Sequence, residues 1–251
     1  MTDTGAADAR LLDGRLVLRQ PARGHRVGTD TMLLAACIAD PGDLVVDAGA
    51  GVGAVGLAVA LRAPDAQVRL LERQADLAAI AEENAAANGL AARTRVLACD
   101  LLVPASRRAA GLANGTASAV LTNPPYYEQG AVRASPHGGR AQAHVLGEGG
   151  VGAWMRACLA LMAPGGRFAM IHLPQALKPI LEACEGRLGA VRILPVHARA
   201  VEDAGRVIIT GRKGSRAPLA IAPGFVVHRA DGGFTAEAEA IHRGAALLAR
   251  E

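Results

Sequence analysis

The fold of this chain is decided by the stretch Val45-Val46-Asp47-Ala48-Gly49-Ala50-Gly51-Val52-Gly53. The apolar residues that lead into it, from Leu44 to Asp47, are typical of a short buried strand, and residues 54–62 have the pattern of a helix that ends before Pro64. Glycines between a strand and a helix let the backbone turn tightly and approach a ligand closely. Open α/β sheets bind ligands at this point. The stretch favours a nucleotide-binding turn over a purely structural one.

Strand-like and helix-like segments alternate from Leu44 to Pro195, which is typical of a parallel sheet with helices on both faces. We expect further strands at 68–72, 95–98, 119–122 and 168–172, and helices at 76–88, 153–162 and 236–250. The segments 191–196 and 207–210 are joined by too few residues for a crossover helix, so they should pair antiparallel. The sequence predicts one α/β domain over residues 1–251, with a seven-stranded, mostly parallel sheet and an antiparallel C-terminal hairpin.

Composition limits the classes of protein to be considered. The chain has 251 residues and a net charge of +4, and it lacks an apolar run of the roughly 18 residues that span a bilayer. Its first residues do not resemble a signal peptide, so we expect a cytoplasmic protein without a membrane partner. The four cysteines are too widely spread for a zinc site or a disulfide framework. The positive charge permits RNA as a partner, although scattered arginines are equally typical of an ordinary solvated surface.

Carboxylates stand at the ends of the first three expected strands. Asp47 lies where a dinucleotide would place its pyrophosphate, and two anions there would repel each other. Glu72 ends the second strand, where a carboxylate can accept both ribose hydroxyls, and Asp100 follows the third, where it can accept the amino group of an adenine. Each of these two also fits a solvated strand end. Together the three carboxylates favour a nucleoside with a cationic amino acid tail over a nicotinamide dinucleotide.

The motif Asn123-Pro124-Pro125-Tyr126 follows the fourth strand directly. Two successive prolines fix the backbone and leave carbonyl oxygens as acceptors. The side-chain oxygen of Asn123 and the carbonyl of Pro124 can then accept hydrogen bonds from one NH₂ group, while Tyr126 offers a flat face for a planar base or amide. A proline-rich turn without a role is the alternative, and the order of the two motifs makes it remote.

With both motifs in place, the sequence resembles the class I S-adenosylmethionine-dependent methyltransferases of the Asn-Pro-Pro-Tyr subgroup, whose members methylate adenine N6, cytosine N4 or a glutamine amide. The resemblance spans roughly residues 44–195 and implies a Rossmann-like class I methyltransferase fold. It implies a catalytic motif made of Asn123, Pro124, Pro125 and Tyr126. We expect S-adenosylmethionine to be held by Arg26, Gly28, Thr29, Asp30, Asp47, Ala48, Gly49, Gly51, Gly53, Glu72, Arg73, Asp100, Leu101 and Asn123.

A narrower likeness is carried by residues 24–34, by Glu83, Asn84 and Asn88, and by residues 211–214. These segments are similar to those of the bacterial tRNA1(Val) adenine N6-methyltransferases. The likeness implies RNA, with tRNA preferred, as the partner. The implied reaction is direct in-line displacement, in which the amino nitrogen attacks the sulfonium methyl without a metal or a covalent intermediate. The oligomeric state is left open.

Two segments outside the regular pattern are candidates for binding roles. Residues 129–152 are rich in glycine and form our candidate substrate loop, with an insertion of no function as the alternative. Its basic residues are Arg133, His137, Arg140 and His144. Thr29 and Asp30 either close over the methionine end of the cofactor or form a capping turn before a helix near Thr31. Residues 1–13 are expected to be flexible.

Three other functions compete with RNA methylation. A protein glutamine methyltransferase would present a planar NH₂ group to the same acceptors, but the separate helical domain expected for a protein partner has no room before Leu44. A nicotinamide-dependent oxidoreductase would have no use for Asp47 or the Asn-Pro-Pro-Tyr motif. A non-catalytic RNA-binding protein would not need both motifs intact.

Overall fold

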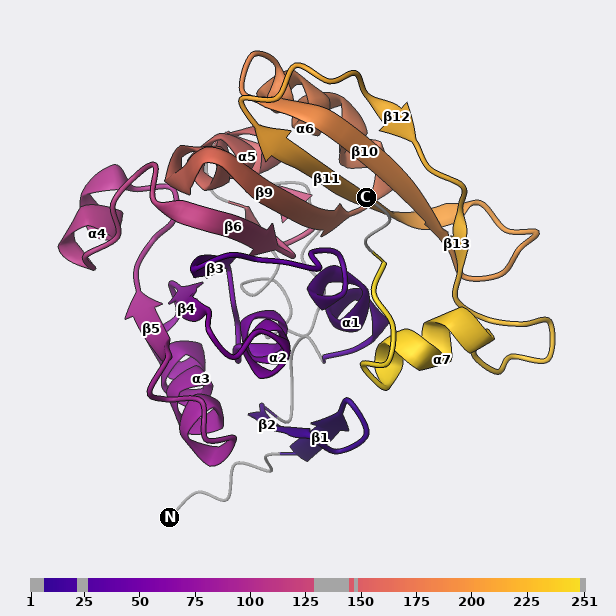
Figure 1. Cartoon of the computed structure of the whole chain (residues 1–251), viewed down its shortest axis with the longest axis horizontal. Helices are drawn as coiled ribbons and strands as arrows, with labels where there is room; N and C mark the ends of the chain where they lie inside the picture. The colour runs from indigo at the N-terminus through magenta and orange to yellow at the C-terminus, as the bar shows by residue number, and fades with distance from the viewer. Residues whose placement is uncertain (1–6, 22–26, 129–144, 147–148, 249–251) are drawn as a thin grey trace, which may run out of the picture.

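The computed structural model describes residues 7–21, 27–128, 145–146 and 149–248. Within these ranges a nine-stranded mixed sheet forms the centre of the molecule (Figure 1), in the order β12-β10-β11-β9-β6-β3-β4-β5 with β13 beside β10. Its strands are β3 (Leu44–Ala48), β4 (Gln67–Glu72), β5 (Thr94–Ala98), β6 (Ala117–Thr122), β9 (Met162–His172), β10 (Leu188–His197), β11 (Ala204–Lys213), β12 (Ala220–Ile221) and β13 (Phe225–Val226).

Five neighbouring strands, β5, β4, β3, β6 and β9, run parallel, so their carboxyl ends lie along one edge of the sheet. β11 is antiparallel to both of its neighbours, β9 and β10. This arrangement confirms the expected Rossmann-like fold and the antiparallel C-terminal pair. The strand count exceeds the expected seven because two-residue strands, β12 and β13, pair with the outer side of β10.

Helices cover both faces of the sheet, with α1, α2 and α3 on one side and α5 and α6 on the other (Figure 1). The helices are α1 (Thr29–Ala35), α2 (Ala54–Arg62), α3 (Ala75–Ala87), α4 (Pro104–Ala109), α5 (Gly150–Leu161), α6 (Leu177–Cys184) and α7 (Ala236–His242), with a 3₁₀ turn at Pro174–Ala176.

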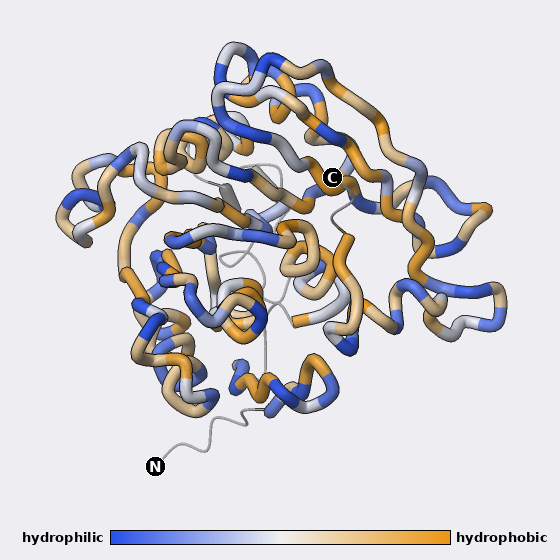
Figure 2. Tube along the Cα trace, in the orientation of Figure 1, coloured by the Kyte–Doolittle hydropathy of each residue, from blue (hydrophilic) through white to orange (hydrophobic). Residues whose placement is uncertain are grey.

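Successive residues of β3 point to opposite faces of the sheet, and both faces are covered by helices, which explains the apolar run of this strand. Val45 packs on the face covered by α1, α2 and α3, and Val46 packs on the face covered by α5 and α6. Figure 2 shows hydrophobic residues along α1, while hydrophilic residues gather in the outer loops. Among the described residues, no helix is long and apolar enough to cross a membrane.

The N-terminal part of the chain forms a hairpin where we expected flexibility. β1 (Ala7–Leu11) pairs antiparallel with β2 (Leu16–Gln20). Two side-chain amides bond to the free backbone groups of β2: Asn84 of α3 bonds to the N–H and C=O of Arg19, and Asn88, the C-terminal cap of α3, does the same for Val17. Residues 7–13, part of the stretch 1–13 that we expected to be flexible, thus lie in a hairpin whose further partners are far along the chain, and their flexibility stays a prediction.

The candidate substrate loop is described only in part. Its last residues belong to α5, which begins at Gly150 rather than at Ala153, and β7 (Tyr127–Glu128) pairs in parallel with β8 (Val145–Leu146). Residues 129–144 and 147–148 lie outside the described part of the chain, and with them Arg133, His137, Arg140 and His144. The C-terminal helix ends at His242 instead of Arg250.

Candidate active site

The glycine-rich turn joins β3 to α2 at the carboxyl edge of the sheet. Gly49, Gly51 and Gly53 all have positive φ angles, of 76°, 56° and 88°. The amides of Gly49 and Ala50 donate to the carbonyl of Leu71 on the next strand, at 2.9 and 2.8 Å. A Cβ atom added to Gly51 would meet no other atom within 4 Å. The turn is thus a backbone surface with open space beside Gly51, as a closely bound ligand requires.

Asp47 is buried at the base of this turn, with 2% of its surface exposed. Its Oδ2 accepts a hydrogen bond from the amide of Gly56, in the first turn of α2, at 2.8 Å. Burial raises the pKa of Asp47 to about 7; the Gly56 amide opposes this rise and Glu72 adds to it. Ala48, which ends β3, is buried, and its carbonyl accepts the hydroxyl of Thr122 at 2.7 Å.

The carboxylate of Glu72 spans the gap between the glycine turn and the end of β4. It accepts hydrogen bonds from the amide of Gly51 at 2.9 Å and from the amide of Gln74 at 2.8 Å. Each of its oxygens keeps further lone pairs, so hydroxyl donors remain compatible with these contacts. Glu72 ends β4 as expected and lies beside the turn, and its role as the ribose carboxylate stays a prediction.

Asp100 follows the next strand, β5. Its Oδ1 accepts the amide of Leu102 at 2.8 Å, and its Oδ2 lies 3.8 Å from a guanidinium nitrogen of Arg73. Leu101, beside it, is buried in the core under α5 and α6. Asp100 therefore has a fixed orientation at the strand end, although it does not contact Glu72 or Asp47 directly.

The Asn-Pro-Pro-Tyr motif follows β6, the neighbour of β3 on its other side. The hydroxyl of Tyr126 lies 2.9 Å from Oδ1 of Asn123 and 2.9 Å from Oδ2 of Asp30. Pro124 is buried and Pro125 half-buried, which fixes the backbone between these two side chains. Burial, with Asp30 next in effect, raises the pKa of Tyr126. The hydroxyl is thus the neutral donor in this cluster at physiological pH.

The first turn of α1 meets the motif through Asp30 rather than through Thr29. Helix α1 begins at Thr29, with exposed Gly28 as its N-terminal cap, so it starts two residues earlier than expected. Arg26 lies outside the described residues. The contact of Asp30 with Tyr126 was not foreseen, and a role for Thr29 and Asp30 at the methionine end of the cofactor stays a prediction.

Three side chains near the motif were missed in the sequence analysis. Arg206, on β11, donates to Asp30 at 2.9 Å, and its Cζ lies 4.9 Å from the centre of the Tyr126 ring. His172 ends β9 with its ring 5.2 Å from that of Tyr126, at 75°. Trp154, the only tryptophan, donates to Thr122 at 2.9 Å and packs under Gly49. As the single tryptophan of the chain, Trp154 could have been chosen from the sequence as a candidate site residue, whereas Arg206 belongs to no recognisable motif. We call Asp30, Asn123, Tyr126, His172 and Arg206 the acceptor cluster.

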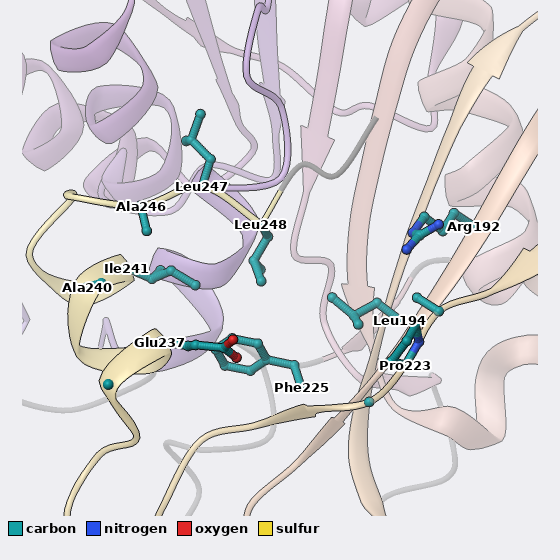
Figure 3. A pocket seen from close by; sticks show the side chains of 13 residues that line it. Arg192, Leu194, Pro223, Phe225, Glu237, Ala240, Ile241, Ala246, Leu247 and Leu248 are labelled. Carbon is teal, nitrogen blue, oxygen red and sulfur yellow. The ribbon is translucent and has the colours of Figure 1, made fainter.

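A pocket of about 630 Å³ lies elsewhere, between β10, residues 222–225, α7 and residues 246–248 (Figure 3). Its lining includes Arg192, Leu194, Phe225, Ile241 and Leu248. None of its lining residues belongs to the acceptor cluster or to the predicted cofactor set.

The strand-end residues fit S-adenosylmethionine. Open space beside Gly51, a half-buried Asp100 and the buried Glu72 offer a backbone surface and carboxylate acceptors for a nucleoside. Asp47, fixed on the helix amide where a phosphate would bind, makes the turn unsuitable for a pyrophosphate.

Comparison with known proteins agrees with this geometry. Residues 24–140 match the family model described as methyltransferase small domain. The crystal structure of a predicted O-methyltransferase from Agrobacterium tumefaciens is 33% identical, with a TM-score of 0.74 over 88% of this chain and 99% of that one. This chain belongs to the class I S-adenosylmethionine-dependent methyltransferases. S-adenosylmethionine is accordingly its cofactor.

Two curated methyltransferases are also similar in sequence. The tRNA1(Val) (adenine(37)-N6)-methyltransferase of Glaesserella parasuis is 28% identical over 62% of this chain and 63% of its own length. The release factor glutamine methyltransferase of Moorella thermoacetica is 30% identical over 61% of this chain and 55% of its own length. The chain thus spans less than two thirds of either relative, and the two names differ in acceptor.

Proposed function

We propose that this methyltransferase acts on the exocyclic N6 amino group of adenine in RNA, with tRNA as the RNA class. The observation that carries the proposal is the position of Asn123, whose Oδ1 stands at the carboxyl end of β6 within hydrogen-bond distance of the Tyr126 hydroxyl. A half-buried amide oxygen beside an aromatic ring suits a planar acceptor with an NH₂ group.

The residues of the chain contribute mainly alignment and charge stabilisation. S-adenosylmethionine supplies a methyl group on a positively charged sulfur. Asn123 and the carbonyl of Pro124 hold the two amino hydrogens, which directs the nitrogen lone pair away from them. Such alignment accounts for roughly 7 to 11 kcal/mol of barrier lowering in well-oriented reactions. The amide oxygen of Asn123 binds more strongly as positive charge develops on the nitrogen.

The preference for RNA rests on charge and on one relative. The chain as a whole has a pI near 9.2. Its net positive charge favours a polyanionic acceptor. The name of the Glaesserella parasuis relative gives the N6 of a tRNA adenine as the methylated atom.

A protein glutamine amide is the second candidate acceptor. Two relatives carry the name release factor glutamine methyltransferase, and a glutamine side chain offers the same planar NH₂ group to Asn123. The two candidates differ in the polymer that becomes methylated, which one assay can separate.

Radiolabelled S-adenosylmethionine is incubated with the protein and, separately, with total tRNA, ribosomal RNA and a cell protein extract. Label recovered from tRNA as N6-methyladenosine is the expected result. Label on protein glutamine supports the second candidate instead, and label on a hydroxyl oxygen or on no fraction overturns the proposal. The Asn123→Ala variant, run in parallel, controls for a contaminating methyltransferase.

A further inference from the structure

The hydroxyl of Tyr126 faces two acceptors at equal distance, Oδ1 of Asn123 and Oδ2 of Asp30, each 2.9 Å away. A phenol has one proton, so it donates to only one of the two at a time. The oxygen of Asn123 that the proposed reaction needs is therefore shared with Tyr126 before an acceptor binds.

Asp30 is held in place by Arg206, not by Tyr126 alone. The Nε of Arg206 donates to the same Oδ2 atom at 2.9 Å, and the two side chains are only 32% and 23% exposed. Partial burial makes this ion pair less screened than a surface pair. Oδ2 of Asp30 is thus held where it can accept the hydroxyl of Tyr126.

The ring of Tyr126 is held as well as its hydroxyl. The guanidinium of Arg206 lies over the ring, and the buried ring of His172 meets it nearly at right angles. Both contacts are favourable geometries for an aromatic ring. Arg206 therefore contacts Tyr126 through the ring and, by way of Asp30, through the hydroxyl.

We propose that Asp30 and Arg206 are positioning residues that keep the Tyr126 ring in place and take over its hydroxyl hydrogen bond when the acceptor amine occupies Asn123. The exchange loses no hydrogen bond, because the proton of Tyr126 turns from Oδ1 of Asn123 to Oδ2 of Asp30. Without the pair, the hydroxyl would compete with the amine for Asn123. This inference rests on the role proposed for Asn123 in the acceptor reaction.

The first test needs no acceptor. The protein is labelled with ¹³C at the ζ carbon of tyrosine, whose chemical shift reports the hydrogen bonding of the hydroxyl, and Tyr127→Phe assigns the two signals. Arg206→Met and Asp30→Asn should each shift the Tyr126 signal. Arg212→Met, an arginine on the same strand that bonds to the carbonyl of Gly165, is the matched control and should leave it unchanged. An unchanged Tyr126 signal in both variants overturns the proposal.

The second test is a double-mutant cycle on methyl transfer to total tRNA. Arg206→Met should lower kcat about tenfold with Tyr126 present and by clearly less in the Tyr126→Phe background, where the ring contact remains but the hydroxyl exchange is gone. If Arg206 instead binds RNA phosphate, its loss raises KM equally in both backgrounds and with a dependence on salt, which contradicts positioning. If tRNA is no acceptor, the proposed function fails, while the tyrosine signals still decide on the positioning pair.

Discussion

The carboxylate of Asp47 accepts a hydrogen bond from the amide of Gly56 at 2.8 Å, which ties the end of β3 to the first turn of α2. A Cβ atom at Gly56 would lie 2.2 Å from a methyl carbon of buried Leu70 and 3.1 Å from Cβ of Asp47, so a larger residue there would displace one of these side chains. The anion-binding end of the helix is thus filled by a side chain of the protein itself. A family that binds a cationic cofactor has no need of a phosphate at that end.

This burial predicts an unusual pH dependence of stability. The pKa of Asp47 rises from 3.8 to about 7 in the folded protein, so between those values the folded state holds a proton that the unfolded chain releases. The stabilisation is complete below pH 4 and is lost as the pH rises towards 7. Asparagine does not titrate, so the free energy of unfolding of the Asp47→Asn variant should rise relative to that of the wild type by up to ~4 kcal/mol as the pH increases over this interval. Urea unfolding from pH 4 to 8 measures the difference; parallel curves contradict it.

Open space beside Gly51 predicts a variant that separates binding from folding. Gly51 and Gly111 both have positive φ angles, of 56° and 78°, and both have room for a Cβ atom. Replacement by alanine should therefore cost each about 1 to 2 kcal/mol of stability through backbone strain. Only Gly51→Ala should also weaken S-adenosylmethionine binding, by about tenfold or more in calorimetry, because the added methyl occupies the turn. Equal affinities in the two variants would place the cofactor elsewhere.

Asn123→Ala should remove turnover without removing the cofactor. The variant loses the amide oxygen that we assign to the acceptor, and losses of this kind lower kcat about a hundredfold or more. Tyr126 keeps Asp30 as a partner, so the local structure should survive. The measurement pairs a methyl-transfer assay with calorimetry of S-adenosylmethionine, and Asn114→Ala, in an exposed loop, is the control. Near-normal turnover removes Asn123 from the mechanism.

The sequence predicted the parts of the fold that carry a local signal. The seven longer strands of the central sheet, which are β3, β4, β5, β6, β9, β10 and β11, were found because each contains a short apolar stretch, as is typical where both faces of a sheet are covered. The glycine turn and the Asn-Pro-Pro-Tyr motif lie at the strand ends where we expected them, because each motif and the strand before it are formed by adjacent residues. The start of α5 was missed because Gly149, Gly150 and Gly152 are typical of a loop, although Val151 and Met155 are buried there.

What the sequence did not reveal depends on partners far along the chain. Arg206 lies 176 residues from Asp30, and nothing near either residue indicates that they meet. The hairpin β1–β2 was missed because the polar side chains that complete it come from α3 and its C-terminal cap, 65 and 71 residues away. Contacts of this kind arise from the tertiary fold, and a local pattern does not contain them.

The attachment of β2 to α3 gives the last prediction. Asn84 is 2% exposed and makes three hydrogen bonds, to the N–H and C=O of Arg19 and to the carbonyl of Val52. Asn84→Ala leaves the buried carbonyl of Val52 and the part-buried N–H and C=O of Arg19 without this partner and should cost about 2 to 4 kcal/mol in urea unfolding. Glu83→Gln removes an exposed ion pair to the same arginine and should cost less than about 1 kcal/mol.

Hydrogen exchange locates the effect of the Asn84 substitution. The amide of Arg19 should lose its protection in Asn84→Ala and keep it in Glu83→Gln, because only the asparagine accepts from that amide. The Val52 carbonyl belongs to the glycine turn, so the same variant should loosen the turn and weaken S-adenosylmethionine binding as a secondary effect. If the two variants unfold at the same urea concentration and exchange alike, the hairpin is held by its buried leucines, Leu16 and Leu18, and the asparagine amides contribute little.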